Sequence, residues 1–341
     1  MAQFLLGKTM AELEAVCTAA GLKRYVAKQL ADWLYKKGVR RIEDMTNLSK
    51  ENRARLASEY EVGHIAPAET LTSKDGTRKY AFEAVAPGQY IESVMIPDRD
   101  RATLCVSSQA GCKMGCKFCM TGRQGFHGNL TAREIIAQFM DVEEAPLLTN
   151  AVFMGMGEPL DNWENVRKAI EILTADWGFA WSPKRITLST IGDLATLKEF
   201  LDGTSCHLAV SLHNPFHTER QELMPVENRY PLEDVLELIR QYDFTGQRRV
   251  TFEYIVFAGL NDTKRHADAL ARMLRGLECR VNLIRFHKIP GSTFTSGSDA
   301  LVEQFQRRLE AAGVTTTIRA SRGEDIMAAC GLLAGKNSNR Q

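Results

Sequence analysis

Residues 102–119 read Ala-Thr-Leu-Cys-Val-Ser-Ser-Gln-Ala-Gly-Cys-Lys-Met-Gly-Cys-Lys-Phe-Cys, and the fold can be argued outward from this stretch. Its first six residues are mostly apolar or small, which is typical of a buried strand. Three cysteines follow with C-x3-C-x2-C spacing: Cys112, Cys116 and Cys119. They stand where a glycine-rich dinucleotide fingerprint would follow the first strand of many α/β proteins. The stretch therefore predicts a strand that leads into a metal-binding loop.

The cysteine spacing allows three sulfurs to surround one metal-containing group. Gly111, Gly115 and Gly122 on either side let the backbone bend tightly around it. A closed zinc site needs four protein ligands, so three thiolates favour an iron–sulfur cluster with one iron open to a small molecule. On spacing alone, a zinc site completed by Cys105 or His127 remains an alternative.

From about residue 102 the chain alternates between candidate strands and helices, which is the pattern of a parallel sheet. Candidate strands are 102–107, 150–155, 185–190, 207–212, 249–257, 281–286 and 314–319. Candidate helices are 131–143, 163–174, 193–201, 231–242, 263–275 and 299–311. About six βα units predict an α/β fold with either an open sheet or a partial (β/α)6 barrel. We expect this part to span 98–320, with a C-terminal segment at 321–341.

The part before the predicted barrel has two units. Residues 1–65 show apolar residues at helical spacing and predict a small helical domain. Residues 66–97 contain two alternating runs that predict a β-hairpin extension, in whose second strand Glu92 would ordinarily face water. A cluster of basic residues in the helical domain suits a phosphate backbone or a solvated helix surface. Its members are Lys23, Arg24, Lys28, Lys36, Lys37, Arg40 and Arg41.

The composition points to a cytoplasmic protein. The chain has 341 residues, 44% of them hydrophobic, a formal net charge of +1, and no apolar run long enough to span a bilayer. Its N-terminus lacks the features of a signal peptide. In a reducing compartment the eight cysteines are better explained as ligands, catalysts or buried thiols than as disulfides. We assign Cys17, Cys206 and Cys279 to the core.

Polar residues and glycines follow several of the predicted strands, where parallel α/β folds gather their sites. These residues are Gly157, Glu158, Ser189, Ser211, His213 and His287. Together they could hold an amino acid-like group by its ammonium and carboxylate. Beyond the last strand, Cys330 lies between small residues that leave its sulfur accessible, and it could form a transient disulfide with Cys105.

Four ordered motifs give the chain a specific resemblance. They are Arg101-Ala-Thr-Leu-Cys-Val-Ser-Ser-Gln, the three-cysteine loop, Met154-Gly-Met-Gly-Glu-Pro-Leu and Arg322-Gly-Glu-Asp-Ile-Met-Ala-Ala-Cys-Gly. The cysteine spacing followed by Gly-Glu-Pro resembles the radical S-adenosylmethionine (SAM) enzymes. More narrowly, the four motifs resemble the RlmN family of dual-specificity RNA adenine C2 methyltransferases, and the likeness runs through nearly the whole chain.

The resemblance implies a role for each candidate residue. Cys112, Cys116 and Cys119 would ligate a [4Fe-4S] cluster whose fourth iron is chelated by SAM. Gly157, Glu158, Ser189, Ser211 and His213 would contact SAM, and so would His287, which stands where many family members have asparagine. Cys330 would carry a methyl group, Cys105 would later attack the Cys330 sulfur, and Glu92 would be the general base. This role for Glu92 replaces the expectation that it faces solvent.

The family's chemistry explains why a cluster is needed, because C2 of adenine is not nucleophilic. By resemblance, one SAM methylates Cys330, a second yields a radical that activates the S-methyl group, and the carbon adds to the base. Cys105 then releases the product and leaves a disulfide that an external electron donor reduces. The family's targets are adenine 2503 of 23S rRNA and adenine 37 of certain tRNAs. We expect a monomeric enzyme with RNA partners and no membrane association.

Three alternatives remain open at this point. A Cfr-type enzyme with the same cysteines methylates C8 of the same rRNA adenine. A zinc-dependent RNA-binding protein would have no catalytic activity and no visible colour. A radical SAM enzyme acting on proteins or small molecules would leave Cys105 and Cys330 without a role.

Overall fold

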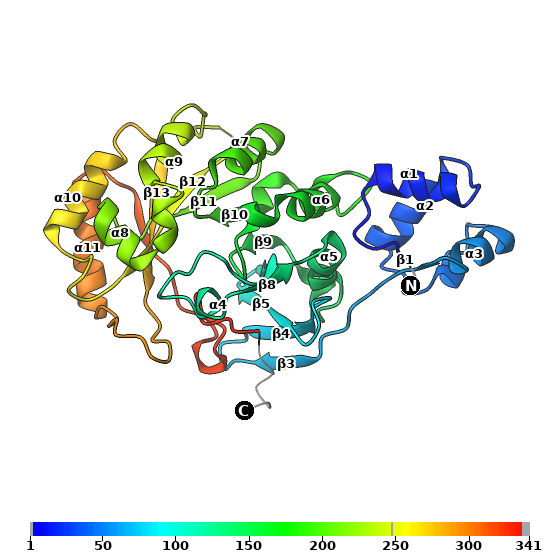
Figure 1. Cartoon of the computed structure of the whole chain (residues 1–341), viewed down its shortest axis with the longest axis horizontal. Helices are drawn as coiled ribbons and strands as arrows, with labels where there is room; N and C mark the ends of the chain where they lie inside the picture. Colours follow the sequence, from blue (N-terminus) through cyan, green and yellow to red (C-terminus); the bar gives the residue numbers. More distant parts are fainter. Residues whose placement is uncertain (1–2, 247, 336–341) are drawn as a thin grey trace.

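The fold is built around one ten-stranded mixed sheet (Figure 1). The computed structural model describes residues 3–246 and 248–335. The strands lie in the order β14-β13-β12-β11-β10-β9-β6-β5-β4-β3. Their bounds are Glu69–Thr72 (β3), Arg78–Glu83 (β4), Tyr90–Asp98 (β5), Arg101–Cys105 (β6), Asn150–Phe153 (β9), Ile186–Thr190 (β10), His207–Ser211 (β11), Val250–Val256 (β12), Cys279–Arg285 (β13) and Thr316–Ile318 (β14).

In this sheet β6, β9, β10, β11, β12, β13 and β14 run parallel, and β5, β4 and β3 extend it in antiparallel fashion. Within the described residues the sheet begins at β14 and ends at β3 without closing on itself. The predicted α/β fold with an incomplete barrel is therefore confirmed. The antiparallel edge is the predicted hairpin, continued by the short strand β3, which was not anticipated.

Six helices alternate with the parallel strands, as predicted. They are Ala132–Met140 (α5), Trp163–Thr174 (α6), Leu194–Gly203 (α7), Leu232–Ile239 (α9), Lys264–Met273 (α10) and Asp299–Ala311 (α11). In α6 the apolar stripe Val166, Ala169, Ile170 and Leu173 is buried, as its spacing requires. Helix α5 begins with a capping box in which Thr131 and Glu134 satisfy each other's backbone N–H groups.

The strands of the middle of the sheet are apolar because both of their faces are covered. In β11 the side chains of Leu208, Ala209 and Val210 are all fully buried, and in β12 Phe252 and Tyr254 are as well. Burying each large apolar side chain contributes about 1.5–3 kcal/mol. The rigid middle of the sheet therefore supports the loops that follow β9, β10, β11 and β12.

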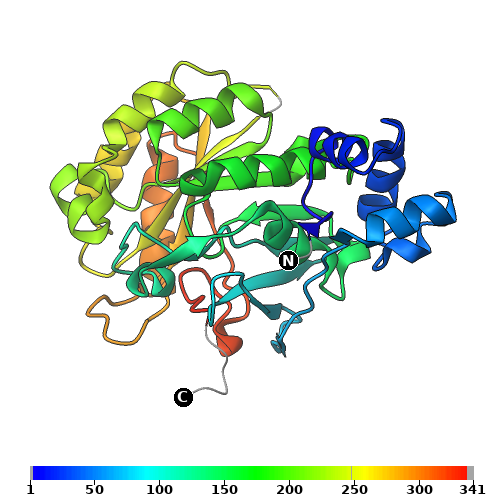
Figure 2. The same cartoon turned by 45° about the vertical axis from the view of Figure 1, so that its right-hand side comes forward.

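A small helical unit lies at one end of the molecule, shown in blue in Figures 1 and 2. It consists of Met10–Ala19 (α1), Val26–Ala31 (α2) with a π-helical continuation Asp32–Lys36 (η1), the short turn Ile42–Asp44 (η2) and Lys50–Ala57 (α3). Strands Gln3–Phe4 (β1) and Tyr60–Glu61 (β2) pair in parallel beneath it. The carboxylate of Asp141, directly after α5, fixes the segment that leads out of the helical unit. It contacts His64 Nδ1 at 2.7 Å and accepts a hydrogen bond from Ile65 N–H at 2.9 Å.

The seven basic residues of the helical unit are all exposed, but four of them already have acidic partners. Arg24 pairs with Glu14, and Lys37 pairs with Asp32. Arg40 and Arg41 pair with Asp141 and Asp44. The positive field of this face is thus weaker than the sequence suggests. Lys23, Lys28 and Lys36 are the other three exposed basic residues of the face.

Three structural elements near the cysteines were not predicted. They are the hairpin of Gln109–Gly111 (β7) with Phe126–Asn129 (β8), the single turn Met120–Arg123 (α4) and the helix His217–Leu223 (α8). Among the described helices, none is both long and apolar enough to cross a membrane. The domain boundaries after residues 65, 97 and 320 stay predictions, and 336–341 lie outside the described residues.

Candidate active site

The three cysteines lie on a loop, residues 112–119, whose neck is closed by β7 and β8; we call it the thiol loop. The N–H of Cys112 donates to the carbonyl of Gly125 at 2.9 Å. Gly111 has φ +72°, and a Cβ there would lie 1.9 Å from the Gly125 oxygen. Only glycine allows the two ends of the loop to approach this closely.

We expect Gly111→Ala to open the thiol loop. Gly259→Ala is the matched control, since Gly259 also has φ +72° but a Cβ added there would meet no described neighbour within 4 Å. Both variants lose about 1–2 kcal/mol through the left-handed backbone, but only Gly111→Ala adds a clash. Alkylation of buried Cys116, followed by mass spectrometry, should accelerate about tenfold or more in Gly111→Ala alone. Equal rates in the two variants would contradict the close approach.

The three thiols line one cavity of about 160 Å³, here called the thiol cavity. Burial raises the pKa of Cys112 to about 12. Burial and the neighbouring thiols also raise the pKa of Cys116, and burial raises that of Cys119. Buried thiols of this kind ionise when a metal supplies positive charge.

The spacing of the thiols fits a cluster better than a single zinc ion. Among the described residues, the group whose possible ligand atoms all lie within 4.8 Å of one another is His217, Glu227 and Glu233, not the three cysteines. Thiolates bound to one zinc at about 2.3 Å would lie about 3.8 Å apart. The proposed fourth zinc ligands also fail to join the set, because neither Cys105 nor His127 lines the thiol cavity. The donor set fits a larger group with three thiolate ligands.

Five of the predicted strand-end residues line this same cavity: Gly157, Glu158, Ser189, Ser211 and His213. Glu158 is held by the protein, since its Oε1 accepts from Thr190 Oγ1 at 2.6 Å and from Leu160 N–H, and its Oε2 accepts from Ile191 N–H at 3.0 Å. Burial raises the pKa of Glu158 to about 7. Its Oε2 can accept one further hydrogen bond from a ligand.

His213 is a neutral hydrogen-bond donor. Ile255 N–H donates to its Nδ1 at 3.1 Å, so the neutral ring carries its proton on Nε2. Burial lowers the pKa of His213 to about 3. Its backbone φ of 55° and the edge of the Phe118 ring, 4.8 Å away between centroids, orient the imidazole within the wall.

Arg220 of α8 supports the loop after β11 from behind. Its Nε donates to the carbonyl of Leu212 at 2.9 Å, and its Nη2 donates to that of Ser211 at 2.7 Å. Its Nη1 pairs with the fully buried carboxylate of Glu227. Burial lowers the pKa of Arg220 to about 10, so the guanidinium stays charged at neutral pH.

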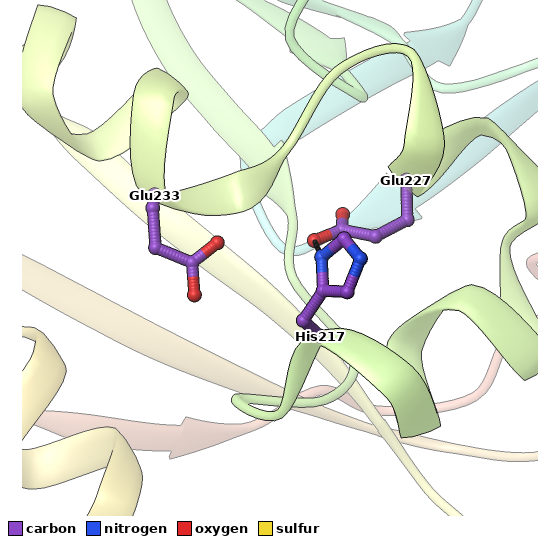
Figure 3. Close-up of side chains that lie close together, drawn as sticks. All are labelled: His217, Glu227 and Glu233. Atoms are coloured by element: carbon purple, nitrogen blue, oxygen red, sulfur yellow. Dashed lines mark hydrogen bonds and ion pairs between the residues drawn. The ribbon is translucent and has the colours of Figure 1, made fainter.

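The group of His217, Glu227 and Glu233 shown in Figure 3 is part of this support. His217 Nδ1 lies 3.0 Å from Glu227 Oε1, and the other oxygen of Glu227 is bound by Arg220. The guanidinium of Arg220 already neutralises the negative charge of buried Glu227. That carboxylate therefore cannot also neutralise a divalent metal ion. We therefore assign a structural role, not a metal-binding role, to His217, Glu227 and Glu233.

The C-terminal segment carries Cys330 to the thiol loop, in red beside α4 in Figure 1. Met120 N–H donates to the carbonyl of Gly331 at 2.8 Å, and Thr121 Oγ1 donates to that of Leu333 at 2.7 Å. Cys330 thereby lines the thiol cavity and also a second cavity of about 510 Å³. Cys105 lines the second cavity as well, so the structure brings the two outlying thiols together.

We call the second cavity the arginine cavity, because its charged lining is mostly cationic. Four arginines, Arg101, Arg185, Arg319 and Arg322, and one carboxylate, Asp98, take part in its wall. Arg319 lines both cavities. Burial raises the pKa of Cys105 to about 12, and the Cys330 thiol raises it too, while Arg319 opposes the shift.

His287 is set apart from the other predicted SAM contacts. It lines the arginine cavity rather than the thiol cavity. Its Nδ1 lies 3.5 Å from Glu324 Oε1, and its Nε2 lies 3.1 Å from the hydroxyl of Ser321. The contact with SAM that the resemblance implies for His287 stays a prediction without support from this placement.

Glu92 is buried, so the ordinary expectation that a strand carboxylate faces water was wrong here. The side chain pairs with Lys79 at 3.1 Å and accepts from Ala334 N–H at 2.9 Å. These contacts tie it to the C-terminal segment. Neither cavity wall includes Glu92.

Sequence reasoning missed three residues near the cavities. Arg319 directly follows β14, so the strand-end rule could have found it. Glu253 lies inside a buried strand, where a charge is itself a signal. Arg220 carries no local signal, because its role depends on contacts made by α8. Of the cysteines assigned to the core, Cys17 and Cys206 are fully buried and Cys279 is partly buried at its edge.

Comparison with known proteins gives a consistent result. Residues 106–271 match the radical SAM superfamily, and residues 4–62 match the ribosomal RNA large subunit methyltransferase N-terminal domain. A protein of Parabacteroides distasonis named probable dual-specificity RNA methyltransferase RlmN is 57% identical over 97% of this chain and 96% of its own length. The dual-specificity RNA methyltransferase RlmN of Syntrophus aciditrophicus is 42% identical over 96% of this chain and 95% of its own.

One solved structure agrees with the sequence matches over nearly the whole chain. The crystal structure of a radical SAM methyltransferase from Sphaerobacter thermophilus superposes with a TM-score of 0.91 and 40% identity, covering 98% of this chain and 100% of that one. Its likeness extends over the helical unit, the sheet and the thiol loop alike. With its three-cysteine cavity and these full-length relatives, the chain belongs to the RlmN family of radical SAM methyltransferases.

Proposed function

We propose that this protein methylates C2 of adenine in RNA, with adenine 2503 of 23S rRNA and adenine 37 of tRNA as its targets. The observation that carries the proposal is the meeting of Cys105 and Cys330 in one cavity next to the thiol cavity. A radical SAM enzyme for proteins or small molecules would have no use for this pair of thiols. The names of the full-length relatives also support an RNA substrate.

The cofactors are assigned from the donor set. Cys112, Cys116 and Cys119 would hold a [4Fe-4S] cluster, and Gly157, Glu158, Ser189, Ser211 and His213 would hold SAM in the same cavity. A cluster bound there would supply the electron that cleaves SAM reductively, and the cleavage would yield a carbon radical. The Glu158 carboxylate suits the ammonium of the methionyl group, and the Nε2–H of His213 suits an acceptor on the nucleoside.

Cys330 is the proposed methyl acceptor. Its thiolate would displace the methyl group from the sulfonium of a first SAM, leaving S-adenosylhomocysteine and an S-methyl group on the protein. Its exposed position between the two cavities allows it to face SAM on one side and the RNA base on the other. The guanidinium of Arg319 lines both cavities as well.

Cys105 is the proposed release group. The S-methyl group would first give one hydrogen atom to the carbon radical, its carbon would join C2, and the adduct would lose a proton and, to the oxidised [4Fe-4S] group, an electron. The Cys105 thiolate would then attack the Cys330 sulfur. The carbon–sulfur bond breaks, the base leaves with the bond's electron pair and takes up a proton, and a Cys105–Cys330 disulfide remains. An external dithiol must then supply two electrons and two protons to restore both thiols.

Glu92 is the proposed acceptor of the C2 proton, by family resemblance. Its carboxylate is engaged by Lys79 and by the backbone of Ala334, and it lies outside both cavity walls. The role therefore requires that the C-terminal segment move and release the carboxylate during the reaction.

The arginine cavity is the proposed entrance for the RNA. An adenine must leave its stack to reach Cys330, and the flanking phosphates then need cationic partners. Its four arginines outnumber the single carboxylate of the same wall. The exposed Lys23, Lys28 and Lys36 of the helical unit would add contacts to more distant phosphates.

The test is nucleoside analysis after incubation of the iron-loaded protein with SAM, a reductant and unmodified rRNA fragment or tRNA. We expect 2-methyladenosine by mass spectrometry, and 8-methyladenosine would overturn the regiochemistry in favour of a Cfr-type reaction. Cys116→Ala should be colourless and yield no product, because a cluster ligand is lost. Cys279→Ala, which changes a cysteine outside both cavity walls, should keep colour and activity. A colourless wild type with one zinc per chain would refute the proposal.

A further inference from the structure

Glu253 of β12 has a buried carboxylate oxygen that nothing in the described chain satisfies. The residue is 3% exposed. Its Oε1 accepts from Asn282 Nδ2 at 2.8 Å and from Thr251 Oγ1 at 3.2 Å. Its Oε2 makes no hydrogen bond to any described residue. Leaving such an acceptor unpaired costs about 1–3 kcal/mol, and more for a charged group, so a fold tolerates it where something else binds there.

The carboxylate lies in the wall of the thiol cavity, together with Ser211 and His213. Glu253 and Ser211 are directly opposite each other in the parallel pair β11–β12. The backbone carbonyl of Glu253 accepts from Leu212 N–H at 3.1 Å and from His213 N–H at 3.2 Å. The same residue therefore shapes the loop after β11 with its backbone and reaches the cavity with its side chain.

The nearest cation does not satisfy the oxygen. Arg319 Nη1 lies 3.7 Å from Oε2, which is too far for a hydrogen bond, and it donates instead toward Met154 Sδ at 3.1 Å. Arg319 compensates the charge of the carboxylate without using its lone pairs. The oxygen is thus kept in place and remains able to accept from a ligand.

We propose that Glu253 is a further ligand-binding residue whose Oε2 accepts hydrogen bonds from the ribose hydroxyls of the nucleoside sulfonium in the thiol cavity. The inference rests on the proposed function, since it takes SAM as the ligand. The three thiols and Glu158 are assigned to the methionyl end of SAM. The hydroxyls of the sugar are then the hydrogen-bond donors left to face the β11–β12 side of the cavity. Carboxylates also accept hydrogen bonds from sugar hydroxyls in dinucleotide sites.

The experiment measures SAM binding by the iron-loaded protein without reductant, so that no turnover occurs. Glu253→Gln keeps an oxygen for Asn282 and Thr251 but presents an amide donor in place of Oε2. We expect its Kd for SAM to rise about 10- to 100-fold, the loss of a charge-assisted hydrogen bond. For a SAM analogue without the 2′- and 3′-hydroxyls, wild type and Glu253→Gln should bind within about twofold of each other.

Controls separate a binding role from a structural one. Glu237→Gln makes the same charge change on the exposed side of α9 and should bind SAM like wild type. If Glu253→Gln does not fold, Glu253→Asp keeps the charge for Arg319 but retracts the oxygen, and it should show the same selective loss. Equal weakening for SAM and the dideoxy analogue, or no weakening, would overturn the inference alone. A wild type that binds no SAM would overturn the proposed function with it.

Discussion

Replacing Cys105 by alanine should leave RNA covalently attached to the protein through Cys330. In the proposed reaction the base is tethered to the Cys330 sulfur, and the two thiols line the same cavity so that Cys105 can reach that sulfur. Without the Cys105 thiol the adduct cannot be released, and it should accumulate to a large fraction of the chains instead of the trace present in wild type. After nuclease digestion, mass spectrometry should find a nucleotide joined by a one-carbon bridge to the peptide containing Cys330.

Two further variants make this result specific. The double variant Cys105→Ala with Cys330→Ala should carry no RNA, because the methyl acceptor is gone. Cys206→Ala changes a fully buried cysteine outside both cavities and should behave as wild type. RNA attached in the double variant, or no attachment in Cys105→Ala, would exclude the tethered route.

Arg220→Met should lower the free energy of unfolding by about 3–5 kcal/mol, because it leaves the carboxylate of Glu227 buried without its cation. The change also removes the donors to the carbonyls of Ser211 and Leu212. Urea unfolding should therefore begin at lower concentration. Since the Ser211 loop forms part of the thiol cavity, SAM binding should weaken in the same variant.

A second substitution, at the ion-pair partner Glu227, tests whether the lost stability comes from the uncompensated charge. Arg220→Met combined with Glu227→Gln removes the uncompensated charge and should recover more than half of the lost stability, as the removal of whole buried pairs often does. Arg265→Met is the matched control, because Arg265 also pairs with a glutamate, Glu219, but is largely exposed. Its effect should be about 1 kcal/mol or less. A similar loss in Arg220→Met and Arg265→Met would refute the role assigned to the buried pair.

The helices were predictable where their pattern was long and amphipathic. The predicted bounds of α6 and α11 match the structure, because each presents a sustained apolar stripe to the sheet. The short elements were missed for the opposite reason. Strand β7 has three residues and helix α8 has seven, too few for a periodic pattern to stand out, and both are held by contacts with distant parts of the chain.

The candidate site divides along the same line. The residues at and after the ends of β9, β10 and β11 could be predicted to lie together, because the carboxyl ends of parallel strands meet at one edge of the sheet. The thiol spacing could be recognised directly in the sequence. Glu92 was misjudged from its strand alone, since its burial comes from Lys79 and the C-terminal segment. The orphan oxygen of Glu253 could not be foreseen, because a missing partner is visible only when all neighbours are placed.

By itself the sequence determined the alternation of strands and helices, the parallel sheet and a loop with three closely spaced thiols. These features follow from local hydrophobic periodicity and from spacing over a few residues. Only the tertiary structure decided that the C-terminal segment docks on α4, directly after the thiol loop, through hydrogen bonds from Met120 and Thr121. That docking brings Cys330 and Cys105 to one cavity. It depends on hydrogen bonds between segments that lie far apart in the sequence, which no local pattern encodes.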